Sequence, residues 1–155
     1  MIMKKMTHIL FTLVALTVLP VFAQRWEYVE RKDPITDANR SRVEVINNEG
    51  HALSFMHMED GINVVLLWGK YFGGDRLDRV QVTYRIDSQV AVGPRNWHLM
   101  TSKRAAWMPM NEIAGFRQAL SRGQTITIRI VDPLDGETIT TAFPLAGFNN
   151  VVRRL

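Results

Sequence analysis

The segment VTYRID, residues 82–87, contains a base and an acid two positions apart, Arg85 and Asp87. Its apolar and polar residues alternate, which is typical of a strand with one buried face. Residues i and i+2 of a strand point to the same face, so Arg85 and Asp87 are expected to pair with each other or with a neighbouring strand. An exposed pair contributes at most about 1 kcal/mol. We favour a pair that fixes strand register or anchors the loop carrying Trp97; the alternative is an arginine that binds a partner.

The histidines, serines and glycines form no recognisable catalytic or metal-binding arrangement. His51 and His57 are six residues apart on a predicted strand, which separates them by about 20 Å, too far to share one metal ion. No serine lies in a GxSxG motif, and the glycines of residues 69–74 lack the GxGxxG spacing of a phosphate-binding loop. The sequence therefore predicts no enzymatic activity, no cofactor and no metal site.

Two further groups of residues are candidates either for partner contact or for structure. Asp33 and Asp37 bracket a proline in a polar segment, where they form either a calcium-type oxygen cluster or a turn between strands. We favour the turn, because a calcium loop needs more closely spaced oxygen ligands. The tryptophans form either a sugar- or partner-binding surface or part of the core, and the core is the commoner place for large aromatic side chains. Trp97 and Trp107 remain candidate contact residues, and Trp107 is the one expected to be partly exposed.

The N-terminal residues have the pattern of a secretory signal peptide. Lys4 and Lys5 precede an apolar run over residues 9–22, and small residues end it at Ala23. The run is too short for a comfortable membrane span, so we expect cleavage after Ala23, with a retained signal anchor as the alternative. The mature protein is then periplasmic or secreted, in a Gram-negative envelope, and has no stable membrane span.

The rest of the chain, residues 24–155, has a nearly balanced charge and no cysteine. Loss of Lys4 and Lys5 leaves 17 basic and 15 acidic side chains, a formal charge of +2, and no row of basic residues follows one element. Nucleic acid is therefore not an expected partner. The absence of cysteine excludes disulfides and cysteine metal sites, and the length suits a single domain stabilised by packing.

Most of this domain has the two-residue periodicity of β-strands. Apolar residues alternate with polar ones over residues 80–87, and again on both sides of a turn signal in residues 124–145, which predicts a β-hairpin. Four earlier strands are predicted at residues 25–30, 41–46, 52–58 and 62–68. The last of these is apolar on both faces, so it is expected to lie centrally in the sheet.

One segment instead has a helical pattern, over about residues 111–122. Ile113, Phe116 and Leu120 form one apolar stripe, with Asn111 placed to cap the start and Gly123 to end the helix. A short helical turn is predicted at the C-terminus. The expected fold is mainly β: an antiparallel β-sandwich or half-barrel with one helix packed across an opening.

Six segments carry a family resemblance through their order along the chain: Trp26, residues 33–37, 65–72 and 82–87, Trp97, and residues 143–148. Together they resemble the VasI/TagO family of type VI secretion-associated periplasmic proteins. Residues 143–148 also resemble the invasion-associated locus B family of exported proteins, as a weaker match. Cysteines are expected in the VasI/TagO family, one of them where Met56 stands here, so this chain departs from the pattern of a shared disulfide.

The VasI/TagO resemblance implies a non-catalytic accessory protein that binds a protein partner in the cell envelope, such as a component of a secretion apparatus. Two other functions remain open from the residues. One is a periplasmic module that binds a glycan or small ligand through its aromatic side chains. The other is a cell-wall hydrolase, against which the missing catalytic arrangement counts.

Overall fold

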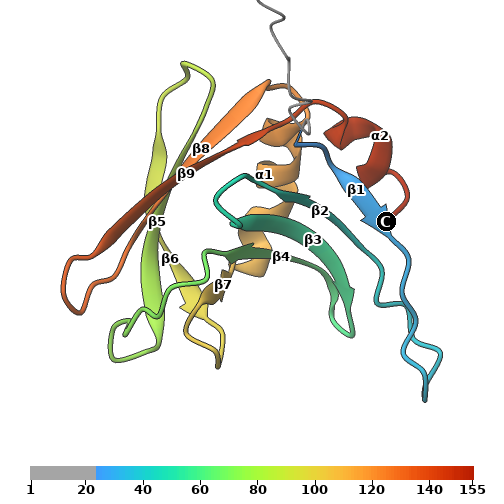
Figure 1. Cartoon of the computed structure of the whole chain (residues 1–155), viewed down its shortest axis with the longest axis horizontal. Helices are drawn as coiled ribbons and strands as arrows, with labels where there is room; N and C mark the ends of the chain where they lie inside the picture. Colours follow the sequence, from blue (N-terminus) through green and yellow to red (C-terminus); the bar gives the residue numbers. More distant parts are fainter. Residues whose placement is uncertain (1–23) are drawn as a thin grey trace, which may run out of the picture.

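The computed structural model describes residues 24–155, and the predicted signal peptide, residues 1–23, lies outside the described residues. Nine antiparallel strands form a single sheet, accompanied by two helices (Figure 1). The mainly β fold predicted from the sequence is thus confirmed. The elements in chain order are β1 (Glu27–Val29), β2 (Arg42–Ile46), β3 (Ala52–Met58), β4 (Gly61–Leu67), β5 (Arg79–Ile86), β6 (Val92–Leu99), β7 (Ala105–Trp107), α1 (Met110–Leu120), β8 (Thr125–Val131), β9 (Thr138–Pro144) and α2 (Phe148–Val152).

The sheet bends around a short central strand. Its strand order is β1-β2-β3-β4-β7-β6-β5-β8-β9, so the three-residue β7 joins two larger halves. These halves, β1–β4 and β5–β9 without β7, lie on the two sides of Figure 1 and enclose a concave face. The result is a half-barrel, because the sheet curves strongly while its end strands β1 and β9 do not pair with each other.

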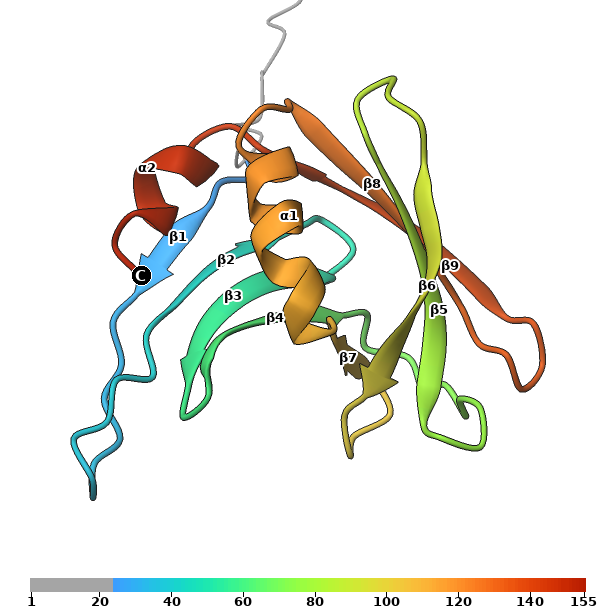
Figure 2. The ribbon, with the colours of Figure 1, turned by 180° about the vertical axis from the view of Figure 1, so that it is seen from behind.

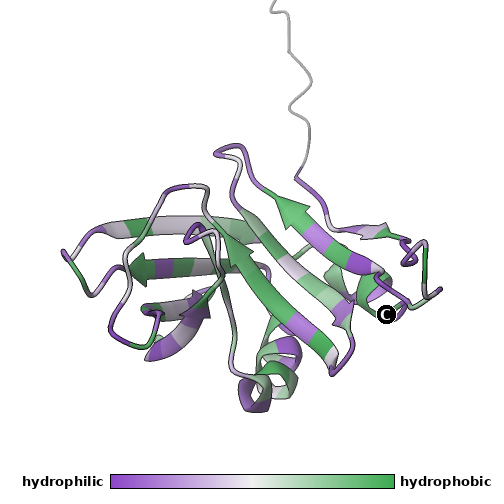
Figure 3. Ribbon diagram, turned by 90° about the horizontal axis from the view of Figure 1, so that it is seen from below, coloured by the Kyte–Doolittle hydropathy of each residue, from purple (hydrophilic) through white to green (hydrophobic). Residues whose placement is uncertain are grey.

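Apolar and polar residues alternate along the strands, so the apolar side chains point to the concave face. In β8, Ile126, Ile128 and Ile130 are fully buried, while the residues between them face outward. The ribbon of Figure 3 shows hydrophobic and hydrophilic bands alternating along the strands. β4 is buried on both faces at Val64 and Val65 and lies inside the sheet, as its sequence predicted.

Helix α1 lies across the concave face and contacts both halves of the sheet (Figure 2). Its buried Phe116 stacks on Phe55 of β3, with ring centroids 6.0 Å apart. The same ring meets Tyr84 of β5 edge-on at 5.0 Å and Trp97 of β6 edge-on at 6.3 Å. One aromatic side chain therefore links the β1–β4 half to the β5–β9 half.

The two ends of the sheet also approach each other at one side of the molecule. The Trp26 indole N–H, just before β1, donates a hydrogen bond to the Pro144 carbonyl at the end of β9, at 2.9 Å. In the β2–β3 turn, Asn47 Nδ2 donates to Thr141 Oγ1 at 2.7 Å. Phe148 of α2 packs against the Trp26 ring, with centroids 4.8 Å apart. The predicted C-terminal helix thus covers the place where the two ends meet.

Three local features differ from the sequence prediction. Helix α1 begins after Pro109 without a side-chain cap, so Asn111 does not cap it, and it ends at Leu120, before Gly123. Gly123 instead allows close packing, since a Cβ there would lie 2.2 Å from a methyl of Ile86. Strand β6 was not predicted because most of its side chains are exposed, which leaves no alternation to detect.

Replacing Phe116 with alanine is expected to lower the free energy of unfolding by about 3–5 kcal/mol, because a buried ring shared by three strands is lost. Urea unfolding followed by tryptophan fluorescence measures this change. Gln118→Ala, at an exposed position of the same helix, is the matched control, with a change within about 0.5 kcal/mol. Equal losses in the two variants would contradict the linking role of Phe116.

Candidate functional site

Arg85 and Asp87, which the sequence places side by side, do different things in the structure. Strand β5 ends at Ile86, and Asp87 takes a left-handed backbone conformation with φ of 49°. Its Oδ1 accepts hydrogen bonds from the backbone N–H groups of Thr125 at 2.9 Å and Gln124 at 3.1 Å. Asp87 therefore fixes the start of β8, and the expected pair with Arg85 does not form.

Arg85 instead lies on an exposed polar surface formed by the outer side of β5, β8 and β9. Strand register puts Arg85 opposite Thr127, Thr83 opposite Arg129, and Arg129 opposite Thr140. Directly paired residues of an antiparallel sheet point to the same side, so these five side chains share one surface, which we call the arginine face. It borders a hollow of about 250 Å³, lined by Thr83, Tyr84, Arg85, Ala91, Thr127, Arg129 and Thr140.

The two arginines of this face have no acidic partner. Within residues 24–155, neither Arg85 nor Arg129 forms an ion pair, whereas Arg42 pairs with Glu44 at 2.8 Å and Arg79 with Asp75 at 2.7 Å. Arg129 Nε donates only a long bond of 3.5 Å, to Thr140 Oγ1. Two guanidinium groups with free donors, surrounded by hydroxyls, are suited to bind carboxylates.

No strong acid or base for catalysis accompanies these arginines. Tyr84 borders the hollow from β5, but its ring lies on the concave side against Phe116. Burial raises the pKa of its phenol, and the negative charge of Glu112 adds to this while Arg95 opposes it. The phenol therefore stays protonated at neutral pH. The arrangement can bind and orient an anion, and its lining residues supply hydroxyl and guanidinium donors.

Asp33 and Asp37 form a turn between β1 and β2, far along the sheet from the arginine face. Asp33 Oδ1 accepts hydrogen bonds from the N–H groups of Ile35 at 3.0 Å and Thr36 at 2.9 Å, and these bonds lower the pKa of the Asp33 carboxyl. Asp37 N–H donates to the Asp33 carbonyl at 3.0 Å. Both aspartates thus serve turn geometry. In the described part of the chain, no cluster of three or more metal-binding side chains is found.

The tryptophans contribute mainly to the core. Trp26, Trp68 and Trp97 are buried, and the indole N–H groups of Trp68 and Trp97 have no hydrogen-bond partner within the described residues. Trp107 is half-buried on the outer side of β7, opposite Val65. A sugar-binding platform would need several exposed rings side by side, and this arrangement offers one tryptophan.

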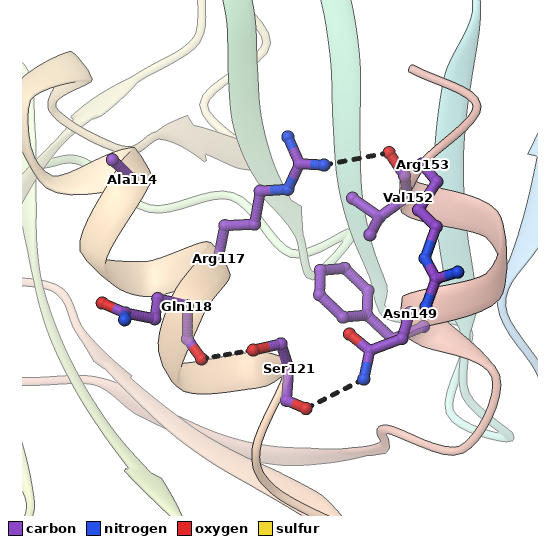
Figure 4. A pocket seen from close by; sticks show the side chains of 8 residues that line it. Ala114, Arg117, Gln118, Ser121, Asn149, Val152 and Arg153 are labelled. Carbon is purple, nitrogen blue, oxygen red and sulfur yellow. Dashed lines mark hydrogen bonds between the residues drawn. The ribbon is translucent and has the colours of Figure 1, made fainter.

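A second hollow, of about 320 Å³, lies between α1 and α2 (Figure 4). Arg117 Nη2 donates to the Val152 carbonyl at 3.2 Å, and Asn149 Nδ2 donates to the Ser121 carbonyl at 2.9 Å. These groups from α1 and α2 hold the C-terminal helix in place. Because its main donors are already used between the helices, this hollow is the weaker candidate for ligand binding.

The structure keeps the six residues selected from the sequence apart. Arg85 is on the arginine face, Asp87 at the start of β8, Trp97 in the core, Trp107 on β7, and Asp33 and Asp37 in the β1–β2 turn. Sequence reasoning missed Thr83, Thr127, Arg129 and Thr140. Their alternation with buried residues did indicate outward side chains, but the strand register that assembles them was not readable from the sequence.

Comparisons with known proteins give a fold relationship and no family. No protein-family model matches the chain. No curated protein sequence matches it. A similar solved structure is that of invasion associated protein B from Bartonella henselae, with 14% sequence identity and a TM-score of 0.52. The match covers 84% of this chain and 90% of that chain. This likeness shows a shared fold, and it fits the weaker of the two resemblances seen in the sequence.

Neither helix within residues 24–155 has the length and apolar character needed to cross a bilayer.

Removal of the Asp87 carboxylate should reveal its role as an anchor for β8. We expect Asp87→Ala to lower the free energy of unfolding by about 1–2 kcal/mol, because two backbone N–H groups lose a charged acceptor. Arg85→Ala is expected to change it by less than about 0.5 kcal/mol. In the double variant the effects should add, since the two side chains do not pair. A coupling energy above about 1 kcal/mol in chemical denaturation would show that they do.

Proposed function

We propose that this protein is an exported, non-catalytic accessory protein of the cell envelope that binds an acidic surface of a protein partner through its arginine face. The observation that carries the proposal is the absence of any acidic partner for Arg85 and Arg129 in residues 24–155. Both side chains are exposed on one broad strand surface. Arginine is favoured at protein interfaces, where its fork of donors binds carboxylates.

The position of Asp87 supports a binding role for Arg85. If the arginine served strand register, the nearest acid in the sequence would be its natural partner. Asp87 instead turns toward the backbone of Thr125 and leaves the guanidinium in solvent. An exposed, unpaired arginine contributes little to stability, so its contribution is better sought in binding.

Export and the type of partner rest on the sequence. The N-terminal pattern of Lys4, Lys5 and the apolar run supports entry into the periplasm. The resemblance to the VasI/TagO family favours a component of a secretion apparatus of the type VI kind as the partner. The fold is also similar to a protein named invasion associated protein B, which is compatible with an accessory role outside the cytoplasm.

Capture from the periplasm of the host tests the proposal. The full chain carrying Arg85→Ala and Arg129→Ala is expected to recover secretion-apparatus components at least about tenfold less than the unchanged protein after crosslinking, because two carboxylate-binding groups are lost. Quantitative mass spectrometry of the captured proteins gives this ratio.

The matched control replaces Arg76 and Arg104, which are also exposed and form no ion pair in the described residues. It carries the same change in charge and should capture normally. Equal capture by both double variants would refute the arginine face as the contact. Absence of secretion components with the unchanged, abundant and folded protein would refute that partner class.

A further inference from the structure

Strand β9 forms one end of the sheet, and one of its sides is open. Its strand neighbour is β8 alone. Directly after β9, the Leu145 N–H donates to the Gln124 carbonyl at 2.8 Å, toward β8. The Ala142 carbonyl points the other way, because it accepts a hydrogen bond from Asn47 Nδ2 at 3.3 Å. Since backbone direction alternates along an antiparallel ladder, the even-numbered residues of β9 face away from β8.

Part of this open side is already covered, and part is not. The Pro144 and Ala142 carbonyls are occupied by Trp26 and Asn47. The outward backbone N–H and carbonyl groups of Thr138 and Thr140, and the Ala142 N–H, have no partner among the described residues. β9 carries no charged side chain, and its proline is the last residue. It therefore lacks the charges and internal prolines that usually block strand addition.

The free edge continues into the arginine face. A hollow of about 350 Å³ follows the edge, lined by Gln24, Asn47, Asn48, Glu49, Thr127, Thr140, Thr141 and Ala142. It shares Thr127 and Thr140 with the hollow beside Arg85 and Arg129. The single carboxylate in its lining, Glu49, lies 3.1 Å from His51 Nδ1. A strand laid along β9 would share this side of the sheet with both unpaired arginines, two strand positions from Arg129 on β8 and three from Arg85 on β5.

We infer that β9 binds an extended acidic segment of the partner as an additional strand of the sheet. This deepens the proposed function, on which it rests, by naming the form and charge of the bound segment. A residue opposite Thr140 would share its outward face, and the Arg129 guanidinium already reaches Thr140, with Nε 3.5 Å from its hydroxyl. An acidic side chain at that position can accept from Arg129, and backbone bonds to Thr138 and Thr140 supply affinity for an extended chain.

A second copy of this protein is a less suitable occupant of the same edge. Pairing β9 with its own copy would bring two arginine faces onto one continuous surface. That surface would then hold two copies of Arg85 and Arg129 with no carboxylate between them, and like charges oppose association. An acidic peptide strand provides the missing charge instead.

A defined peptide tests the inference on the exported protein. The probe is a fluorescein-labelled nonapeptide of alternating threonine and glutamate, and the matched control peptide carries glutamine in place of glutamate. We expect the glutamate peptide to bind at least about tenfold more tightly at low salt, by fluorescence anisotropy. In NMR spectra, the backbone amides of Thr138, Thr140 and Ala142 should shift on binding.

Two variants distinguish the contribution of the β9 backbone to peptide binding from the contribution of the arginine charges. Thr140→Pro removes an outward N–H and should weaken binding at least about tenfold, whereas Thr140→Val keeps that N–H and should stay within about twofold. Arg85→Ala with Arg129→Ala should also weaken binding of the glutamate peptide. If Thr140→Pro does not fold by circular dichroism, the amide shifts of the unchanged protein decide alone.

Four outcomes would overturn the inference. Normal binding by a folded Thr140→Pro variant would refute strand addition, and so would amide shifts that exclude residues 138–142. Either result would leave the arginine face as the contact. Failure of the glutamate peptide to bind at concentrations up to about 1 mM would also refute strand addition. Concentration-dependent self-association that shifts the same amides would show that a second copy occupies the edge. By contrast, normal partner capture by the double arginine variant would refute the proposed function, in which the arginine face is the contact.

Discussion

The fold depends on the packing of α1 into the concave side of the sheet. Phe116 contacts aromatic rings of β3, β5 and β6, which belong to both halves of a sheet joined centrally by the three-residue β7. Without this helix, the inner rows of Val, Leu and Ile side chains would meet water. Because α1 occupies the concave side, the outer side of β5, β8 and β9 has no helix over it. Its threonines and arginines can therefore meet a partner without any rearrangement of the core.

Stability explains the polar groups around the arginine face but not its arginines. Asp87 is bound to the backbone of β8, and Arg79 at the start of β5 is paired with Asp75. Arg85 and Arg129 remain in solvent, where hydration satisfies them and their removal should cost the fold little. A surface whose acids are bound to the protein's own groups while its arginines are unpaired is suited to recognition of carboxylates on another molecule.

Local periodicity in the sequence predicted much of the fold and little of the candidate site. The hairpin of β8 and β9, the strand β3 and the helix α1 follow from alternation and helical spacing, which act over few residues. Strands β6 and β7 were not predicted, because an exposed strand and a three-residue strand have no such pattern. The site depends on register between strands distant in sequence, such as Arg85 opposite Thr127, and on where β5 ends. A strand one residue longer would have kept Asp87 beside Arg85 on the same face.

The open edge of β9 follows from how the half-barrel stops short of closure. Trp26 and Asn47 bond to the last two outward carbonyls of β9, so the two ends of the sheet meet at one side only. β1 has three residues and pairs with β2, so it cannot cover the remaining length of β9. Full closure would satisfy every backbone group, and a fully free edge would favour aggregation. Partial closure leaves a short segment around Thr138 and Thr140, next to the unpaired charge of Arg129. Backbone hydrogen bonds from β9 and attraction of acidic side chains by Arg129 are thereby available at one place. Together they distinguish an extended acidic segment from other ligands better than either does alone.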